Sequence, residues 1–183
     1  MKFFRQIGLT FGVLVLTLCG LGVLGYMSFQ GPIRQEKARL FKKENRQTFK
    51  EALSHTLPMQ LAAYLQRVGA DQNRNSAQVK FQQRGKIWNS PEQEALTFSA
   101  REHISAYHPG FIWYANLFPV YARDKFLDNN GEMWVNMMGL GNIHRSSSPE
   151  VDQGSLMRYL GELVWAPSGF RDEKIQWDST LTK

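Results

Sequence analysis

Hydrophobic residues form one uninterrupted run near the N-terminus and alternate with polar residues almost everywhere else. Residues 7–27 read IGLTFGVLVLTLCGLGVLGYM and hold no charged side chain. A helix needs about 20 mostly apolar residues to cross a bilayer core of roughly 30 Å. A cleavable signal peptide has a shorter apolar core, about 7–15 residues, and a small-x-small cleavage site, which residues 24–28 do not offer. The pattern therefore predicts an uncleaved, single-pass transmembrane anchor over residues 1–30.

The basic residues around this run give opposite indications of its orientation. Lys2 and Arg5 favour an N-terminus on the inside of the membrane, but more Lys and Arg residues follow the run than precede it. By the positive-inside rule, this second flank favours the reverse orientation. The sequence predicts a cell-membrane location and leaves open the side on which the rest of the chain lies.

A second amphipathic segment is predicted directly after the anchor. Gly31 and Pro32 are expected to break the membrane helix or to mark its exit. Apolar residues then recur at mostly helical spacings among basic and acidic ones, which indicates a juxtamembrane helix over residues 31–55. This helix is either a solvated stalk or an interfacial helix lying on lipid, as its basic face would allow.

Residues 56–183 show the pattern of an α+β domain. A short helix is predicted over residues 56–68, followed by strands at 79–87, 96–104, 111–117, 121–127 and 132–138. Asp128-Asn129-Asn130-Gly131 is the clearest hairpin turn. Ser147 to Glu150 start a helix over residues 151–165, and residues 174–181 alternate like a further strand. We predict an antiparallel curved sheet, half-barrel-like, packed on helix 151–165. By analogy only, this shape resembles the half-barrels of lipoprotein-carrier proteins.

Several phrases in this domain resemble a bacterial family of uncharacterised proteins with an N-terminal hydrophobic segment, a domain of unknown function. They include the L-P-x-x-x-x-x-Y-L-x-x-x-G pattern from Leu57 to Gly69 and the later phrases FQQRG from Phe81, HPGFIW from His108 and EVDQG from Glu150. The resemblance covers roughly residues 57–183 and implies no catalytic residues. It also implies that the chain is cut short at its C-terminus, so that the domain is incomplete.

Composition and motifs narrow the possible chemistry. The formal net charge is +6, concentrated near the anchor, where contact with anionic lipid is a simpler explanation than nucleic-acid binding. Cys19 is the sole cysteine, which excludes an intramolecular disulfide. No zinc-binding H-E-x-x-H spacing, nucleophile elbow or dinucleotide fingerprint is present. We therefore expect no metal, no cofactor, no catalytic residues and no nucleic-acid partner.

Aromatic and methionine side chains in the strands are the best candidates for a binding site. Flexible methionines and flat rings suit an adaptable apolar pocket, although an ordinary core would need the same residues. The predicted ligand-binding residues are Trp113, Phe126, Met133, Trp134 and Met137.

Three functions are compatible with these patterns. The first is a non-enzymatic, membrane-anchored protein that binds lipid or another apolar ligand. The second is a structural or interaction module whose open sheet edge pairs with a partner membrane protein. The third, ranked last, is a hydrolase that uses His103 or His108 with carboxylates.

Overall fold

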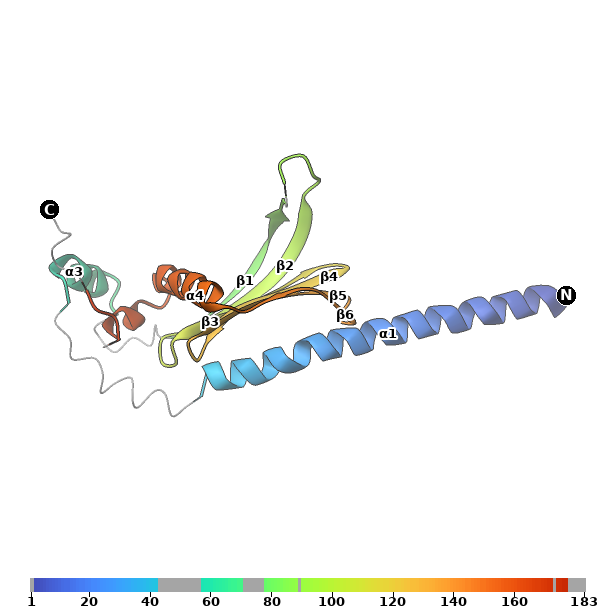
Figure 1. The fold of residues 1–183 in the computed structure, drawn as a ribbon, viewed down its shortest axis with the longest axis horizontal. Helices are drawn as coiled ribbons and strands as arrows, with labels where there is room; N and C mark the ends of the chain where they lie inside the picture. The colour runs from blue at the N-terminus through green and yellow to red at the C-terminus, as the bar shows by residue number, and fades with distance from the viewer. Residues whose placement is uncertain (1, 43–56, 71–77, 89, 173, 178–183) are drawn as a thin grey trace.

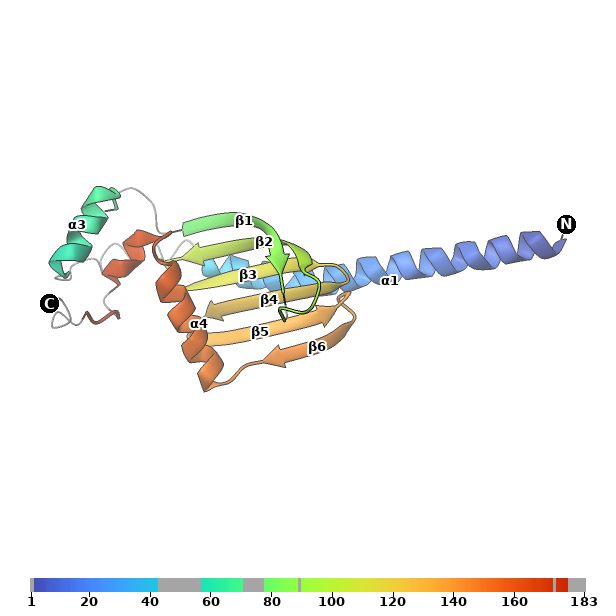
Figure 2. The same cartoon turned by 90° about the horizontal axis from the view of Figure 1, so that it is seen from above.

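The computed structural model describes residues 2–42, 57–70, 78–88, 90–172 and 174–177. A long N-terminal helix, α1 (Lys2–Leu40), lies along one face of a six-stranded antiparallel sheet. A second helix, α4 (Pro149–Glu162), crosses the other face near one end of the strands (Figures 1 and 2). The α+β class and the antiparallel sheet are confirmed.

The sheet is a meander in which every strand pairs with the next one in sequence. Its strands are β1 (Gln78–Ile87), β2 (Leu96–Ser105), β3 (Gly110–Leu117), β4 (Val120–Leu127), β5 (Asn130–Met137) and β6 (Gly141–Ser146). Asp128 and Asn129 take positive φ angles of 54° and 63° in the β4–β5 turn, as tight hairpins require. The predicted hairpin is thus confirmed, and β6 is a strand that the sequence analysis did not predict.

Helix α1 is continuous through the position where a break was expected. It is 39 residues long, or about 58 Å at 1.5 Å per residue, and Pro32 lies inside it. Phe29 and Ile33, on either side of Pro32, are both fully buried against the sheet. Packing on both sides of Pro32 compensates for the hydrogen bond that proline cannot donate. The predicted break at Gly31–Pro32 is therefore wrong, and residues 31–40 belong to α1.

Residues 31–40 form neither a solvated stalk nor an interfacial helix. Ile33 and Leu40 have no exposed surface and join a cluster with Ile112, Tyr114 and Leu127 of the sheet. The remainder of the predicted juxtamembrane helix, residues 43–55, lies outside the described residues.

Each face of the sheet carries its own apolar cluster because successive side chains of a strand point to opposite faces. On the α1 face, Ile33 and Leu40 pack with Ile112, Tyr114 and Leu127. On the other face, Ile104, Phe111 and Phe126 pack against Tyr159 of α4 and against Leu163 just after it. The central strands β3 and β4 therefore contact α1 on one face and α4 on the other.

The sheet is open and not curled, so the predicted half-barrel is wrong. A half-barrel would wrap around a single helix, but here α1 and α4 cover opposite faces (Figure 1). A register irregularity occurs between Val135 and Asn136, where β5 pairs with β6. The part of the sheet that bends in Figure 1 is the β1–β2 hairpin, which rises from the sheet on the side of α4.

Two short helices, α3 and η1, lie outside the sheet and the two long helices. The predicted helix at residues 56–68 appears as α3 (Met59–Arg67), and Gly69 follows it with a φ of 69°, a conformation that favours glycine. A 3₁₀ helix, η1 (Pro167–Arg171), follows α4. Residues 174–177 form a turn and coil in place of the start of the predicted strand over 174–181, of which residues 178–181 lie outside the described part.

Candidate functional site

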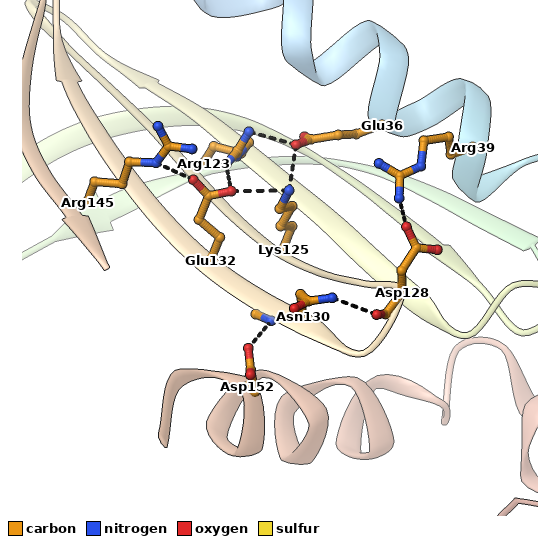
Figure 3. Close-up of polar contacts among 10 residues, drawn as sticks. Glu36, Arg39, Arg123, Lys125, Asp128, Asn130, Glu132, Arg145 and Asp152 are labelled. Carbon is orange, nitrogen blue, oxygen red and sulfur yellow. Dashed lines mark hydrogen bonds and ion pairs between the residues drawn. The ribbon is translucent and has the colours of Figure 1, made fainter. Parts of the chain in front are cut away.

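The seam between α1 and the sheet gathers most of the buried polar groups on that face. Arg123 of β4 has a side chain only 3% exposed, and its Nη1 donates a 2.8 Å hydrogen bond to Glu36 Oε1 of α1. Its Nη2 lies 2.5 Å from Glu132 Oε2 on β5. Lys125 Nζ bridges the same two carboxylates at 2.7 and 3.1 Å (Figure 3). This ion network ties the helix to two strands.

Arg145 of β6 extends the network to the sheet edge. Its Nε lies 2.5 Å from Glu132 Oε1, but its side chain is 62% exposed. Burial alone would raise the pKa of Glu132. The charge of Arg123, with the charge and hydrogen bond of Lys125 and the hydrogen bond from Arg145, outweighs burial and holds this pKa below its ordinary value. Glu132 is therefore ionised at neutral pH.

A second polar contact fixes the C-terminal end of α1. Arg39 pairs with Asp128 at the β4–β5 turn (Figure 3). His108 Nε2 lies 2.5 Å from the other oxygen of that carboxylate. At this end of the sheet, Asp152 of α4 also accepts a 2.6 Å hydrogen bond from the backbone N–H of Gly131. Both helices are thus attached to the β4–β5 hairpin.

The N-terminal end of the seam is a close backbone contact. Gly25 of α1 packs on Met138 and Gly139 in the β5–β6 turn, and a Cβ atom on either glycine would overlap the backbone of the other segment. Gly139 also has a φ of 76°. The sheet therefore begins to cover α1 two residues before the apolar run of 7–27 ends.

A cavity of about 250 Å³ lies beside this contact. We call it the seam cavity. It is lined by Tyr26, Phe29, Gln30, Ser99, Ala100, Arg101, Tyr114, Ala115, Asn116 and Tyr121. Phe29 stacks on Tyr121 with ring centroids 5.2 Å apart and packs on Trp134 at 5.1 Å. The lining thus combines one phenylalanine and three tyrosine rings with one guanidinium, the hydroxyl of Ser99 and two amide side chains.

Two turns next to the seam cavity expose large apolar side chains. Phe118 in the β3–β4 turn is 73% exposed and Leu140 in the β5–β6 turn is 55% exposed. These turns face the half of α1 that extends beyond the sheet (Figures 1 and 2). We call Phe118 and Leu140, with their turns, the turn edge.

The protruding half of α1 is apolar and uncovered. Residues such as Phe11 and Leu16 are 66% and 74% exposed. By length and composition the helix could cross a membrane, and a signal sequence near an N-terminus would have the same properties.

The opposite face of the sheet carries a separate charged cluster under α4. Arg158 lies 2.6 Å from Glu102 Oε1 and 2.6 Å from Asp124 Oδ2, and 2.8 Å from Glu162 Oε1. Its guanidinium also lies over the ring of Phe111, 4.4 Å from the centroid. This cluster holds α4 on the sheet with one cation among three carboxylates.

Glu102 is the most perturbed acid of this cluster. It is 3% exposed. Burial, followed by the charge of Glu162, raises its pKa from 4.5 to about 7, although Arg158 and a hydrogen bond from Gln83 act in the opposite direction. The folded protein therefore holds a proton on Glu102 at pH values where the unfolded chain has lost it.

This proton gives a prediction for the pH dependence of stability. Because the folded-state pKa is raised, the contribution is complete below about pH 4.5 and is lost as the pH rises through about 7. At about 1.4 kcal/mol per pH unit the loss has a ceiling of about 3 kcal/mol. We expect Glu102→Gln, which stays neutral, to remove most of this loss when urea unfolding of the full chain is compared at pH 5 and pH 8.

Glu92→Gln is the matched control for this comparison. Glu92 is exposed in the β1–β2 connection, so its variant should keep the pH dependence of the unchanged protein. If the Glu102→Gln variant lost as much stability between pH 5 and pH 8 as the unchanged protein, the assignment of this pH dependence to Glu102 would be wrong.

The five predicted ligand-binding residues do not come together. Trp113, Phe126, Met133 and Met137 lie on the α4 face, where Phe126 stacks on Tyr159 in the core and Met137 is 42% exposed. Trp134 lies on the α1 face, packed on Phe29 beside the seam cavity. The strand pattern does not show that α1 packs on the sheet. The sequence therefore did not indicate the cavity-lining residues Tyr26, Phe29, Arg101 and Tyr121.

The histidines considered for hydrolysis occupy different surroundings. His108 contacts Asp128 at the turn described above, whereas His103 is 9% exposed and neither ring nitrogen has a hydrogen-bond partner among the described residues. Within the described ranges, no three His, Cys, Asp or Glu side chains are grouped as metal ligands.

Residues 47–182 match the family described as "Family of unknown function (DUF6544)". No curated protein and no solved structure matches the chain. The resemblance predicted from the sequence phrases is confirmed.

Proposed function

The chain belongs to DUF6544, a family of unknown function, and we propose that it is a membrane-anchored, non-enzymatic protein that binds a lipid in the seam cavity. The observation that supports this proposal is the position of the cavity. It lies between α1 and the sheet, and its lining includes Tyr26, where the apolar run of α1 ends. A lipid of the same bilayer could enter the cavity there without crossing water.

The proposed anchor and the turn edge support the same placement. With residues 7–27 in the bilayer, the contact of Gly25 with the β5–β6 turn brings Phe118 and Leu140 to the level of the lipid head groups. Exposed apolar side chains are costly in water but favourable at a membrane interface. The turn edge would then rest on the bilayer and direct the seam cavity toward it.

The lining of the seam cavity suits one part of an amphiphile better than a whole acyl chain. Its volume of about 250 Å³ is below the roughly 300–1,000 Å³ of usual small-molecule sites. Aromatic rings are amphipathic and favour the interfacial region, and Arg101, Gln30 and Asn116 can bind polar head-group atoms. In this proposal the head group and the glycerol region occupy the cavity and the acyl chains remain in the bilayer.

A cavity-filling variant tests this function. Ser99 lines the cavity, so Ser99→Leu should fill part of it and lower the amount of phospholipid that co-purifies with the full chain in mild detergent by about tenfold, equivalent to about 1.4 kcal/mol. Thr97→Leu is the matched control, because Thr97 is exposed on the same strand and face but outside the cavity. Equal lipid in both variants, measured by mass spectrometry of the extract, would contradict the proposal.

A second candidate function follows from the edge strand β6. Residues 141–145 are exposed and Ile143 is 52% exposed, and in the described part of the chain no strand pairs with the outer side of β6. Such an edge can accept a strand from a partner membrane protein. A photo-crosslinker at position 143 should then give a protein adduct in native membranes that is absent with the crosslinker at Met157. Lipid adducts alone would overturn this alternative.

A further inference from the structure

A basic group of side chains surrounds a buried histidine on the α1 face. His103 of β2 is directly opposite Lys80 in the pairing of β1 with β2. Its ring is stacked on Tyr114 with centroids 5.9 Å apart and an interplanar angle of 10°. Phe41 covers it edge-on at 5.6 Å. The imidazole is therefore enclosed by aromatic rings.

Three cations converge on this imidazole from three elements. Lys37 of α1 lies over the Tyr114 ring, 5.2 Å from its centroid, and Lys80 of β1 lies over the Phe41 ring at the same distance. Arg101 is two residues from His103 on the same face of β2. Their charges, after burial, lower the pKa of His103 from 6.5 to about 4.

Nothing in the described part of the chain neutralises these cations. Lys37, Lys80 and Arg101 form no ion pair with any described carboxylate. Glu36, the nearest acid of α1 in sequence, is held by Arg123 and Lys125, and the carboxylate of Glu102 lies on the other face with Arg158. No described residue is a hydrogen-bond partner of either ring nitrogen of His103. A buried polar group without a partner is costly and calls for an explanation.

We propose that Lys37, Lys80, Arg101 and His103 form a binding site for a phosphate group. The three cations provide the charge and the hydrogen bonds that a phosphate accepts, and the imidazole of His103 lies beside them with both ring nitrogens buried. Arg101 of this site and Tyr114, on which His103 is stacked, both line the seam cavity, so the phosphate site adjoins the cavity. The inference rests on the proposed function, because it assigns the charged part of the bound lipid, yet free phosphate would present the same chemistry.

The imidazole of His103 gives a direct readout. A bound phosphate stabilises the imidazolium and should raise the pKa of His103, measured by NMR on full chain with labelled histidine in neutral detergent, by about 1–3 pH units. One arm of the experiment adds inorganic phosphate, and the other adds phosphatidic acid to the micelles, with phosphatidylcholine as the reference lipid. A rise with inorganic phosphate identifies a soluble ligand, and a rise with phosphatidic acid alone identifies a lipid head group.

Lys80→Gln should reduce the rise, whereas Lys86→Gln, with the same charge change on the same strand, should not. No rise in either arm, or an equal rise in both lysine variants, overturns the inference. The two proposals fail separately. If Ser99→Leu lowers the amount of co-purified lipid but neither ligand raises the pKa of His103, the phosphate site alone is overturned. If inorganic phosphate raises the pKa of His103 but Ser99→Leu leaves the amount of co-purified lipid unchanged, the lipid function alone is overturned.

Discussion

Replacing Arg123 by methionine is expected to lower the free energy of unfolding by about 3–5 kcal/mol, the usual cost of removing one partner from a buried ion pair. Arg123 is 3% exposed and lies between Glu36 of α1 and Glu132 of β5. Methionine fills similar space but leaves two buried carboxylates with Lys125 as their remaining buried cation. The loss should be measured by urea unfolding of the full chain in detergent micelles.

Arg145→Met is the matched control for this change. Arg145 contacts the same Glu132, but its side chain is 62% exposed. Exposed ion pairs contribute about 0–1 kcal/mol, so this variant should unfold close to the unchanged protein. Similar small losses in both variants would show that the network does not hold α1 on the sheet.

Replacing Gly139 by alanine is expected to separate the N-terminal end of the seam. A Cβ at this position would overlap the carbonyl of Gly25 in α1, and the φ of 76° is unfavourable for alanine. Overpacking costs about 1–3 kcal/mol, and the left-handed conformation adds about 1–2 kcal/mol. Because the overlap is with backbone, no side-chain rotation can relieve it. We therefore expect a loss of stability and a change in Trp134 fluorescence as Phe29 moves away.

Gly141→Ala distinguishes this effect from a general effect of glycine replacement. Gly141 is two residues further along the chain, and a Cβ there would have nothing within 4 Å. Its variant should keep both the stability and the fluorescence of the unchanged protein. If Gly139→Ala behaves in the same way, the contact between α1 and the β5–β6 turn is not tight in solution.

The sequence predicted those elements whose hydrophobic pattern is local. The run of residues 7–27 indicated a long apolar helix, and alternation located five of the six strands. Strand β6 escaped because its residues are largely exposed, including Ile143, so no alternation between buried and exposed positions marks it. The supposed strand at 174–181 shows the converse error, since Ile175 packs against the core from a coil.

The seam could not be predicted because its partners are distant in sequence. Arg123 and Lys125 belong to a run of three consecutive charged residues, 123–125, so the pattern of β4 does not show which of them a helix covers. Glu36 lies 87 residues before Arg123, and only the return of α1 onto the sheet makes their burial possible. Buried charges require such partners, and the partner of a strand residue cannot be identified from the alternation of that strand.

In the proposed arrangement α1 spans a bilayer, and the turn edge and seam cavity lie at its surface. Site-directed spin labelling of the full chain in phospholipid nanodiscs tests it most directly. The native Cys19 reports on the anchor, and Phe118→Cys or Leu140→Cys in a Cys19→Ser background reports on the turn edge. Gln153→Cys, exposed on α4, is the control for a position in water.

We expect labels at positions 19, 118 and 140 to be accessible to oxygen and protected from a water-soluble nickel complex, with the strongest protection at position 19. The label at position 153 should be accessible to the nickel complex and less accessible to oxygen. Labels at 118 and 140 that match 153 while 19 stays protected would leave the anchor in place but remove the turn edge and the cavity from the membrane. A label at 19 that is open to the nickel complex would contradict the membrane anchor itself.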